Sequence, residues 1–341
     1  MPVKAVIDLK KIVYNAKRIK ARLPEKVKFC AVVKADAYGH GAERVANALY
    51  NIVDCFAVAT VAEGVKLRYA GINKDILVLT RTLNSDLPAA VDNSLTLTVG
   101  EIGDLKRYSR EGKRQGARVK VHIKYDTGMR RQGVNGEDLE YAFAFCEGNE
   151  YLQLDGVYSH FARPENDVSR ERALKEFGLA KTLAKKYNDK GRNIVCHISA
   201  SGGFLKGEYA DMVRIGILLY GYAPFKTDVI RVKPAMKVYA PVLLRRKLKR
   251  GDCALYGEKR AAKDTEIALI GYGYADGLFR KEKKGQFNAR CMDVTAVTGV
   301  KRGAKRVAVM GDADKIAREY ETISYEILVK CALRAEKEYK T

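Results

Sequence analysis

The stretch F-C-A-V-V-K-A-D-A-Y-G-H-G, residues 29–41, opens a repeating pattern of strand, turn and amphipathic helix. Its first five residues form an apolar run that is typical of a strand buried in a parallel sheet. Further runs of this kind follow, with helical stretches between them: Phe56–Thr60, Ile76–Thr80, Leu95–Val99, Val119–Ile123, Leu152–Tyr158, Asn193–Ser199 and Met212–Leu219. The alternation predicts an α/β fold, a (β/α)8 TIM barrel. An open doubly wound sheet is the alternative, but it would normally carry G-x-G-x-x-G after its first strand, and that motif is absent there.

Two helices of this region have recognisable ends. The first is expected ahead of residue 29, with Asp8 as its N-cap and Pro24 as its stop. The clearest one is expected from a cap at Ser169 to a stop at Gly191, with apolar side chains repeating along one face. Both patterns indicate helices that pack on the outside of the barrel.

After Pro234 the sequence changes in character. Short β-rich segments separated by charged turns replace the strand–helix alternation: Val238–Leu244, Cys253–Tyr256, Glu266–Ile270, Arg306–Met310 and Ile323–Val329. Only one helix, Lys315–Glu319, is expected among them. The sequence therefore predicts two domains, a barrel over residues 1–230 and a mostly β domain over residues 231–341.

Composition excludes several classes of protein. The chain has 341 residues, 47% of them hydrophobic, so it can bury a sizeable core and is not disordered. No apolar run reaches the roughly 18 residues of a membrane span, and the first residues do not form a secretory signal. The seven cysteines are scattered without a C-x-x-C pair, which argues against a disulfide framework or a metal site and favours a cytoplasmic protein.

The net charge of +22 would attract anions. Basic residues are nevertheless spread along the whole chain among acidic ones, as on a generally basic surface. Nucleic acid is therefore an unlikely partner on this pattern, whereas a small anionic ligand in a cleft is compatible with it.

Polar residues collect where the expected strands end, which is where barrels carry their active sites. Lys34 directly follows the first strand, so burial should lower its pKa and make it a candidate Schiff-base nucleophile; the alternative is a lysine that reaches solvent from a strand end. The other strand ends contribute Lys124, Arg131, His160, His197, Ser201, Arg214 and Gly216. This joint placement favours a catalytic site.

Eight motifs occur here in the order and spacing of the alanine racemases: V-V-K-A-D-A-Y-G-H-G, K-Y-D-T-G-M-R-R-Q-G, V-Y-S-H-F-A, V-R-I-G-I-L-L-Y-G, A-L-Y-G, G-Y-A-D-G, C-M-D and I-S-Y-E-I-L. The resemblance covers nearly the whole chain. It implies a pyridoxal 5'-phosphate (PLP) enzyme with a barrel and a β domain, a small amino-acid substrate, and a homodimer whose active sites are shared between subunits.

The resemblance implies two bases on opposite faces of the substrate. Lys34 matches the lysine that holds PLP and acts as one base. Tyr256, in A-L-Y-G, matches the second base, which reaches the active site of the other subunit. Racemisation removes a proton from one face and returns one to the other, which suits this pair. The alternative for Tyr256 is a strand aromatic packed at an interface.

Further matches concern the cofactor. Tyr38, Ser201 and Tyr325 match the phosphate-binding side chains, and the backbone N–H groups of Gly216 and Ile217 match the phosphate-binding amides. Arg214 matches the arginine that faces the pyridine nitrogen, and His160 and His197 match residues around it. Core packing is the alternative for His197, and Ala200 stands where the family usually has asparagine.

The remaining matches concern the substrate. Arg131 matches the arginine that meets the substrate carboxylate or the phenolic oxygen of PLP, and Met292 lies near that carboxylate. Lys124 matches a lysine that is N-carboxylated in many relatives, a modification that stays a hypothesis here. Tyr274 and Tyr325 match tyrosines that narrow the entry and leave room for a methyl or hydroxymethyl group, and Tyr325 favours alanine. A serine or broader-specificity racemase of the same fold remains as an alternative. A protein that holds PLP without turnover is another, suggested by the +22 charge and by altered loops such as the short segment from Gly277 to Cys291.

Overall fold

The computed structural model describes residues 2–281 and 284–341. The chain forms two compact units. The barrel unit contains residues 12–37 and 42–233, and the terminal unit contains residues 1–11, 38–41 and 234–341. Each unit has its own sheet, and the two are described separately below.

The sheet of the barrel unit has eight strands in the order β8-β7-β6-β5-β4-β3-β2-β9. Their bounds are β2 Lys28–Val32, β3 Cys55–Val58, β4 Ile76–Arg81, β5 Thr96–Val99, β6 Val119–Lys124, β7 Leu152–Tyr158, β8 Val195–His197 and β9 Met212–Ile215. All neighbours in this order pair in parallel. Between β8 and β9 the backbone N–H groups of Asp211 and Arg214 donate to the carbonyls of Cys196 and Ser199, at 3.0 and 2.9 Å. The sheet is thus a nearly closed parallel barrel, which confirms the predicted (β/α)8 fold.

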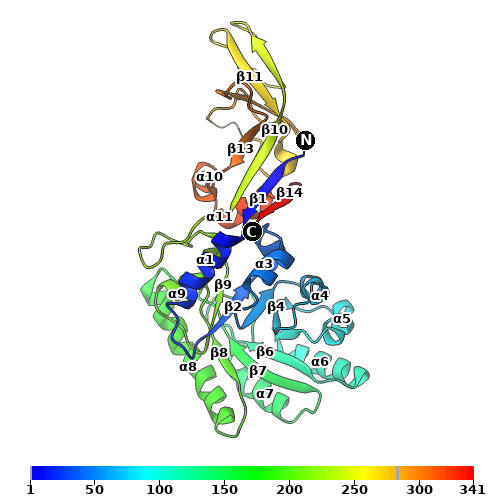
Figure 1. Cartoon of the computed structure of the whole chain (residues 1–341). Coiled ribbons are helices and arrows are strands. Elements are labelled where there is room, and N and C mark those ends of the chain that lie inside the picture. Colours follow the sequence, from blue (N-terminus) through cyan, green and yellow to red (C-terminus); the bar gives the residue numbers. More distant parts are fainter. Residues whose placement is uncertain (1, 282–283) are drawn as a thin grey trace. The chain divides into compact units, whose positions relative to one another are not determined.

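Helices alternate with these strands and lie outside the sheet (Figure 1). They are α1 Leu9–Lys20, α3 Ala42–Leu49, α4 Val61–Tyr69, α5 Leu87–Asp92, α6 Ile102–Gln115, α7 Gly136–Glu147, α8 Asp167–Asn188 and α9 Ser201–Leu205, with 3₁₀ turns η1 Asn84–Asp86 and η2 Ile217–Tyr220. Side-chain caps fix several ends; in α4, Thr60 and Glu63 form a reciprocal capping box. Helix α8 begins earlier than expected, because Asn166 and not Ser169 caps it.

The terminal unit is mostly β, as predicted. Its strands are β1 Lys4–Asp8, β10 Met236–Leu248, β11 Thr265–Ile270, β12 Thr295–Thr298, β13 Arg306–Met310 and β14 Glu336–Lys340. They lie in the order β12-β11-β10-β1-β14, and β13 also pairs with β10. The first strand of the chain thus lies between β10 and the last strand. Two helices, α10 Ala313–Glu319 and α11 Ser324–Cys331, and the turn η3 Tyr274–Asp276 complete the unit.

Two expectations for this unit were wrong. Residues 253–256 form a turn in which Leu255 has φ +55°, so they cannot continue a strand. Ile323–Val329 was expected to be β but lies mostly in α11. The buried side chains of α11 are Ser324, Ile327, Leu328 and Cys331. They recur at helical spacing, which a short apolar run does not reveal.

Within residues 2–281 and 284–341, no helix combines the length and the apolar character needed to cross a membrane. The same described residues contain no group of three or more His, Cys, Asp and Glu side chains placed to hold a metal ion.

Candidate active site

Lys34 begins α2 (Lys34–Tyr38), a short turn with left-handed backbone conformation. Ala35, Asp36, Ala37 and Tyr38 all have φ between 51 and 54°, so one turn of left-handed helix directly follows the lysine. That conformation costs about 1–2 kcal/mol per residue other than glycine. The N–H of Ala35 donates to Glu63 Oε1 at 2.6 Å, and Asp36 Oδ1 accepts from the N–H of Ala42 at 2.8 Å. These contacts hold the turn, and the strain lies beside the candidate nucleophile.

The amine of Lys34 lies among cations. Burial lowers its pKa, and the nearby charge of Arg131 lowers it further, while Glu63 opposes the change. A larger share of neutral amine is therefore present near pH 7 than in an exposed lysine, as a nucleophile or base requires.

Arg214, on β9, is buried, with 3% of its surface exposed. Its guanidinium donates to the carbonyls of Ser159 and Ile198, at 2.7 and 3.2 Å, and to the Nδ1 atoms of His160 and His197. Every one of these acceptors is neutral. The arrangement therefore places a fixed positive charge at the carboxyl end of the strands. Among the described residues, no carboxylate is hydrogen-bonded to this guanidinium.

Arg214 also fixes the tautomers of two histidines. An arginine only donates hydrogen bonds, so His197 Nδ1 must accept and its ring proton must sit on Nε2. That Nε2 lies 2.8 Å from His122 Nδ1, which must accept in turn. The chain of bonds therefore runs from Arg214 through His197 to His122 along the barrel interior.

The histidines around Arg214 are held neutral. Burial first, and then the charge of Arg214, lower the pKa of His122 and of His160 to about 3. The same causes hold the pKa of His197 well below its usual range. Tyr158 stacks on the His197 ring at 4.9 Å between centroids, and the Arg214 guanidinium lies 4.9 Å from the same Tyr158 ring. Neutral acceptors thus surround a single charge.

His122 fits because β7 carries a glycine beside it. A Cβ atom on Gly156 would lie 2.6 Å from the His122 ring. Sequence reasoning gave no role to His122, Gly156 or Tyr158. A glycine inside a strand was the available signal, since it often marks a close approach.

Ser201, Gly216 and Ile217 lie together where two short helices begin. Ser201 starts α9, Ile217 starts η2, and the N–H of Gly216 donates to Ser201 Oγ at 3.3 Å. A Cβ on Gly203 would lie 2.5 Å from Ser199 Oγ, so the backbone there is tightly packed. N–H groups at helix starts suit a phosphate group.

Lys124 ends β6 and is 3% exposed. Burial, then Arg131 and Arg214, lower its pKa to about 8. Among the described residues its ammonium makes an aromatic contact with Tyr158, at 5.9 Å from the ring centroid, and no hydrogen bond to it is found. Arg131 is exposed, on the loop that follows β6.

The terminal unit holds the other expected residues. Tyr38 and Tyr325 lie together, with ring centroids 5.9 Å apart. Burial raises the pKa of Tyr325 to about 12 and raises that of Tyr38 as well. Both phenols therefore stay protonated and can donate hydrogen bonds.

Tyr274 and Met292 are also brought together. The N–H of Tyr274 donates to Cys291 O at 3.0 Å, and the next N–H donates to Met292 O at 2.9 Å. Tyr256 lies apart from these contacts, on the turn before Gly257, and is 87% exposed. A side chain so exposed is free to contact another molecule.

Models of known families match both units. The N-terminal domain of alanine racemase matches residues 7–224, and its C-terminal domain matches residues 235–339. Alanine racemase 2 of Caldanaerobacter subterraneus subsp. tengcongensis is 34% identical over 99% of this chain and 95% of its own length. Alanine racemase of Treponema denticola is 38% identical over 81% of this chain and 76% of its own.

Solved structures agree with these matches. An alanine racemase of Clostridium difficile 630 has a TM-score of 0.92 at 31% identity, over 100% of this chain and 96% of that chain. The alanine racemase of Bacillus anthracis with bound L-Ala-P has a TM-score of 0.87 at 27% identity, over 100% of this chain and 95% of that one. By family models and relatives that span nearly its whole length, the chain belongs to the alanine racemase family of isomerases.

Proposed function

We propose that this chain interconverts L-alanine and D-alanine with PLP as its cofactor. One observation carries the proposal: a lysine amine of lowered pKa and a buried arginine with only neutral acceptors share one end of the barrel unit. Relatives named alanine racemase support the choice of substrate.

The residues present fit PLP. Lys34 would carry it, Ser201, Gly216 and Ile217 would bind its phosphate, and Arg214 would face its pyridine nitrogen. The resemblance adds Tyr38 and Tyr325 as further donors to the phosphate. Bound there, PLP would supply an electron-withdrawing ring that acidifies the Cα–H bond of an amino acid.

Two bases would then exchange the proton. The lowered pKa of Lys34 raises the neutral share of its amine above that of an exposed lysine, so the amine could accept a proton at one face of Cα. Tyr256 of a second subunit would serve the opposite face. A phenol in water ionises only near pH 10, so the cations Arg131, Lys124 and Arg214 would have to favour its charged form. This mechanism requires a homodimer.

Arg214 would determine which reaction follows. It only donates hydrogen bonds, so it would favour an unprotonated ring nitrogen on a bound PLP. It would thereby weaken the electron withdrawal that PLP supplies and disfavour side reactions such as transamination. His160 would help hold the guanidinium in place.

The substrate would be fixed by its carboxylate. Arg131 suits a planar anion, and Met292 would lie nearby. Tyr274 and Tyr325 would leave room for a methyl or hydroxymethyl side chain. A domain boundary at residues 230–231 and a cytoplasmic location stay predictions.

Racemisation of L-Ala, L-Ser and L-Lys by the wild type, Lys34→Ala and Tyr256→Phe tests the proposal. Alanine should be the best substrate, Lys34→Ala should be inactive, and Tyr256→Phe should lose one direction of proton transfer more than the other. A preference for serine or lysine would favour the broader racemase. Absorbance near that of bound PLP with no Cα deuterium exchange would favour a protein that only holds the cofactor. Equal activity of all three proteins would refute the mechanism.

A further inference from the structure

Arg131 lies on a short loop, residues 126–133, whose two ends are joined by backbone contacts. Tyr125 and Val134 form a bridge, and Asp126 Oδ1 accepts the N–H groups of Gly128 and Arg130 at 2.9 and 3.1 Å. These contacts shape the start of the loop. They do not by themselves fix the end that carries Arg131, whose side chain is exposed.

Gln132, the next residue, connects that end to the barrel. Its Nε2 donates to the carbonyl of Leu79 at 2.6 Å, and its Oε1 accepts the N–H of Arg81 at 3.3 Å. Both partners lie where the pairing of β4 with β5 shifts register, between Val78 and Arg81. The side-chain amide thus pairs with strand backbone at an irregular point of the ladder, through a donor and an acceptor at once.

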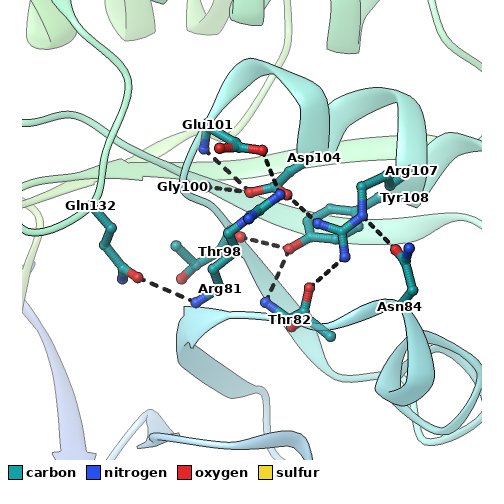
Figure 2. Close-up of polar contacts among 10 residues, drawn as sticks. All are labelled: Arg81, Thr82, Asn84, Thr98, Gly100, Glu101, Asp104, Arg107, Tyr108 and Gln132. Atoms are coloured by element: carbon teal, nitrogen blue, oxygen red, sulfur yellow. Dashed lines mark hydrogen bonds and ion pairs between the residues drawn. The ribbon is translucent and has the colours of Figure 1, made fainter.

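An ionic cluster around the buried carboxylate of Asp104 holds the strand on the other side of this contact (Figure 2). Arg81 Nε donates to Asp104 Oδ1 at 2.8 Å, and Arg107 Nη1 donates to the same oxygen at 2.5 Å. Asp104 is fully buried, and its Oδ2 accepts the N–H groups of Gly100 and Glu101 at 3.0 and 3.2 Å. The carboxylate therefore has hydrogen bonds on both oxygens, which a buried charge requires.

The cluster also reaches the loop directly. The carbonyl of Gly100 accepts the N–H of Gly133 at 2.9 Å. Gln132 and Gly133, the two residues after Arg131, are therefore both tied to the β4–β5 region that Asp104 stabilises. The backbone of the exposed arginine is consequently held from one side by three hydrogen bonds.

We propose that Gln132 is a positioning residue for Arg131, through its paired hydrogen bonds to Leu79 and Arg81. The inference rests on the proposed role of Arg131 in binding the substrate carboxylate. Without the amide, the backbone beside Arg131 keeps the bonds from the N–H groups of Arg130 and Gly133 but loses both bonds to strand β4, so the arginine is positioned less firmly. A misplaced binding group weakens substrate binding more than it slows the chemical step, so KM should change and kcat should not.

The test is a double-mutant cycle on Gln132 and Arg131. Gln132→Met keeps the length of the side chain and removes both hydrogen bonds. We expect it to raise KM for alanine about tenfold, the effect of one or two hydrogen bonds, with kcat within about twofold. In an Arg131→Lys background the same change should alter KM less than about twofold, because the residue being positioned is gone. An unchanged KM in Gln132→Met, or an equal rise in both backgrounds, would overturn the inference.

Gln115→Met is the matched control. Gln115 also donates from Nε2 to a backbone carbonyl, that of Pro88 at 3.2 Å, but it ends α6. Its replacement should leave KM unchanged. If Gln132→Met does not fold, Gln132→Asn replaces it, because an amide shorter by one methylene cannot keep both bonds, and the same KM criterion applies.

Hydrogen exchange separates this inference from the proposed function. Peptides covering residues 126–134 should exchange faster in Gln132→Met than in the wild type or Gln115→Met, whatever reaction the protein catalyses. A wild type that racemises no amino acid would refute the proposed function and leave exchange to decide on Gln132. Equal exchange in all three proteins would overturn the positioning role.

Discussion

Replacing Lys124 with methionine should stabilise the folded chain at neutral pH. The ammonium is almost fully buried, and its strongest charged neighbours are Arg131 and Arg214, which repel it. Asp126 is the acid that opposes them. The pKa of Lys124 falls from 10.5 to about 8 for these reasons, a change that disfavours the charged form by roughly 3 kcal/mol.

The sign of the pH dependence follows from proton binding. The unfolded chain keeps the proton on Lys124 up to pH 10.5, whereas the folded chain loses it at about pH 8. Between these values the unfolded state binds more protons, so stability rises with pH. Below pH 8 the full penalty applies, and above pH 10.5 it is gone.

Urea unfolding from pH 7 to pH 10 measures this effect. Lys124→Met should exceed the wild type in free energy of unfolding by up to about 3 kcal/mol at pH 7, and the gap should close toward pH 10. Lys120→Met is the control on the same strand. The hydrogen bond with Asp75 raises the pKa of Lys120, so loss of this bond should lower the free energy of unfolding at neutral pH. Between pH 8 and pH 10 the stability of the wild type should not rise relative to that of Lys120→Met.

The same lowered pKa bears on N-carboxylation. Near pH 8 about half of the Lys124 amine is neutral and able to add CO2. The carbamate would carry a negative charge beside Arg131 and Arg214, so bicarbonate should narrow the stability gap. Carbon-13 NMR with labelled bicarbonate should show a carbamate signal that Lys124→Met lacks. Parallel pH profiles for wild type and variant, with no such signal, would refute this account of Lys124.

Three further predictions concern Asp104, Gly156 and the buried histidines. Asp104→Asn should lower the free energy of unfolding by about 3 kcal/mol in urea, because one amide cannot accept bonds on both sides; a loss under about 1 kcal/mol would contradict the cluster's importance. Gly156→Ala should lower the melting temperature, since its Cβ would meet the His122 ring at 2.6 Å; an unchanged value would show that the ring can move. Nitrogen-15 NMR should find His122 and His197 neutral with the proton on Nε2 from pH 5 to pH 8, and Arg214→Met should release His197 from that tautomer; a charged ring at pH 6 would contradict the hydrogen-bond chain.

Local patterns were sufficient to predict the barrel but not every element. Apolar runs repeat at regular intervals along β2 to β9, and each run is decided by its own residues. Strand β1 was not predicted, because it pairs with β10 and β14 from the far end of the chain. The segment at Ile323 was assigned to the wrong class, since a short segment rich in apolar residues fits a strand or one face of a helix.

The candidate site likewise contains features that local sequence predicts and features that depend on contacts between residues far apart in the chain. Motifs placed Lys34, Arg214 and Ser201 among the candidate site residues, because functional residue types at fixed spacing can be read along the chain. Nothing local predicts the left-handed turn, since Ala35 and Ala37 disfavour that conformation. The position of Gln132 depends on strand β4, about fifty residues earlier in the chain.

The positive charge of the barrel interior connects stability with binding. Burial is the largest cause of the lowered pKa of His160. The charges of four nearby cations lower that pKa further: Arg214, Arg131, Lys124 and Lys34. Few acids oppose them, and burial followed by repulsion from Arg131 lowers the pKa of both lysines, which destabilises the chain without a ligand. An anion that enters relieves this repulsion, and PLP and an amino acid bring a phosphate and a carboxylate. We therefore expect the charges that weaken the folded state to favour binding of the proposed cofactor and substrate, and neutralising any one of them should lower the affinity and raise the stability.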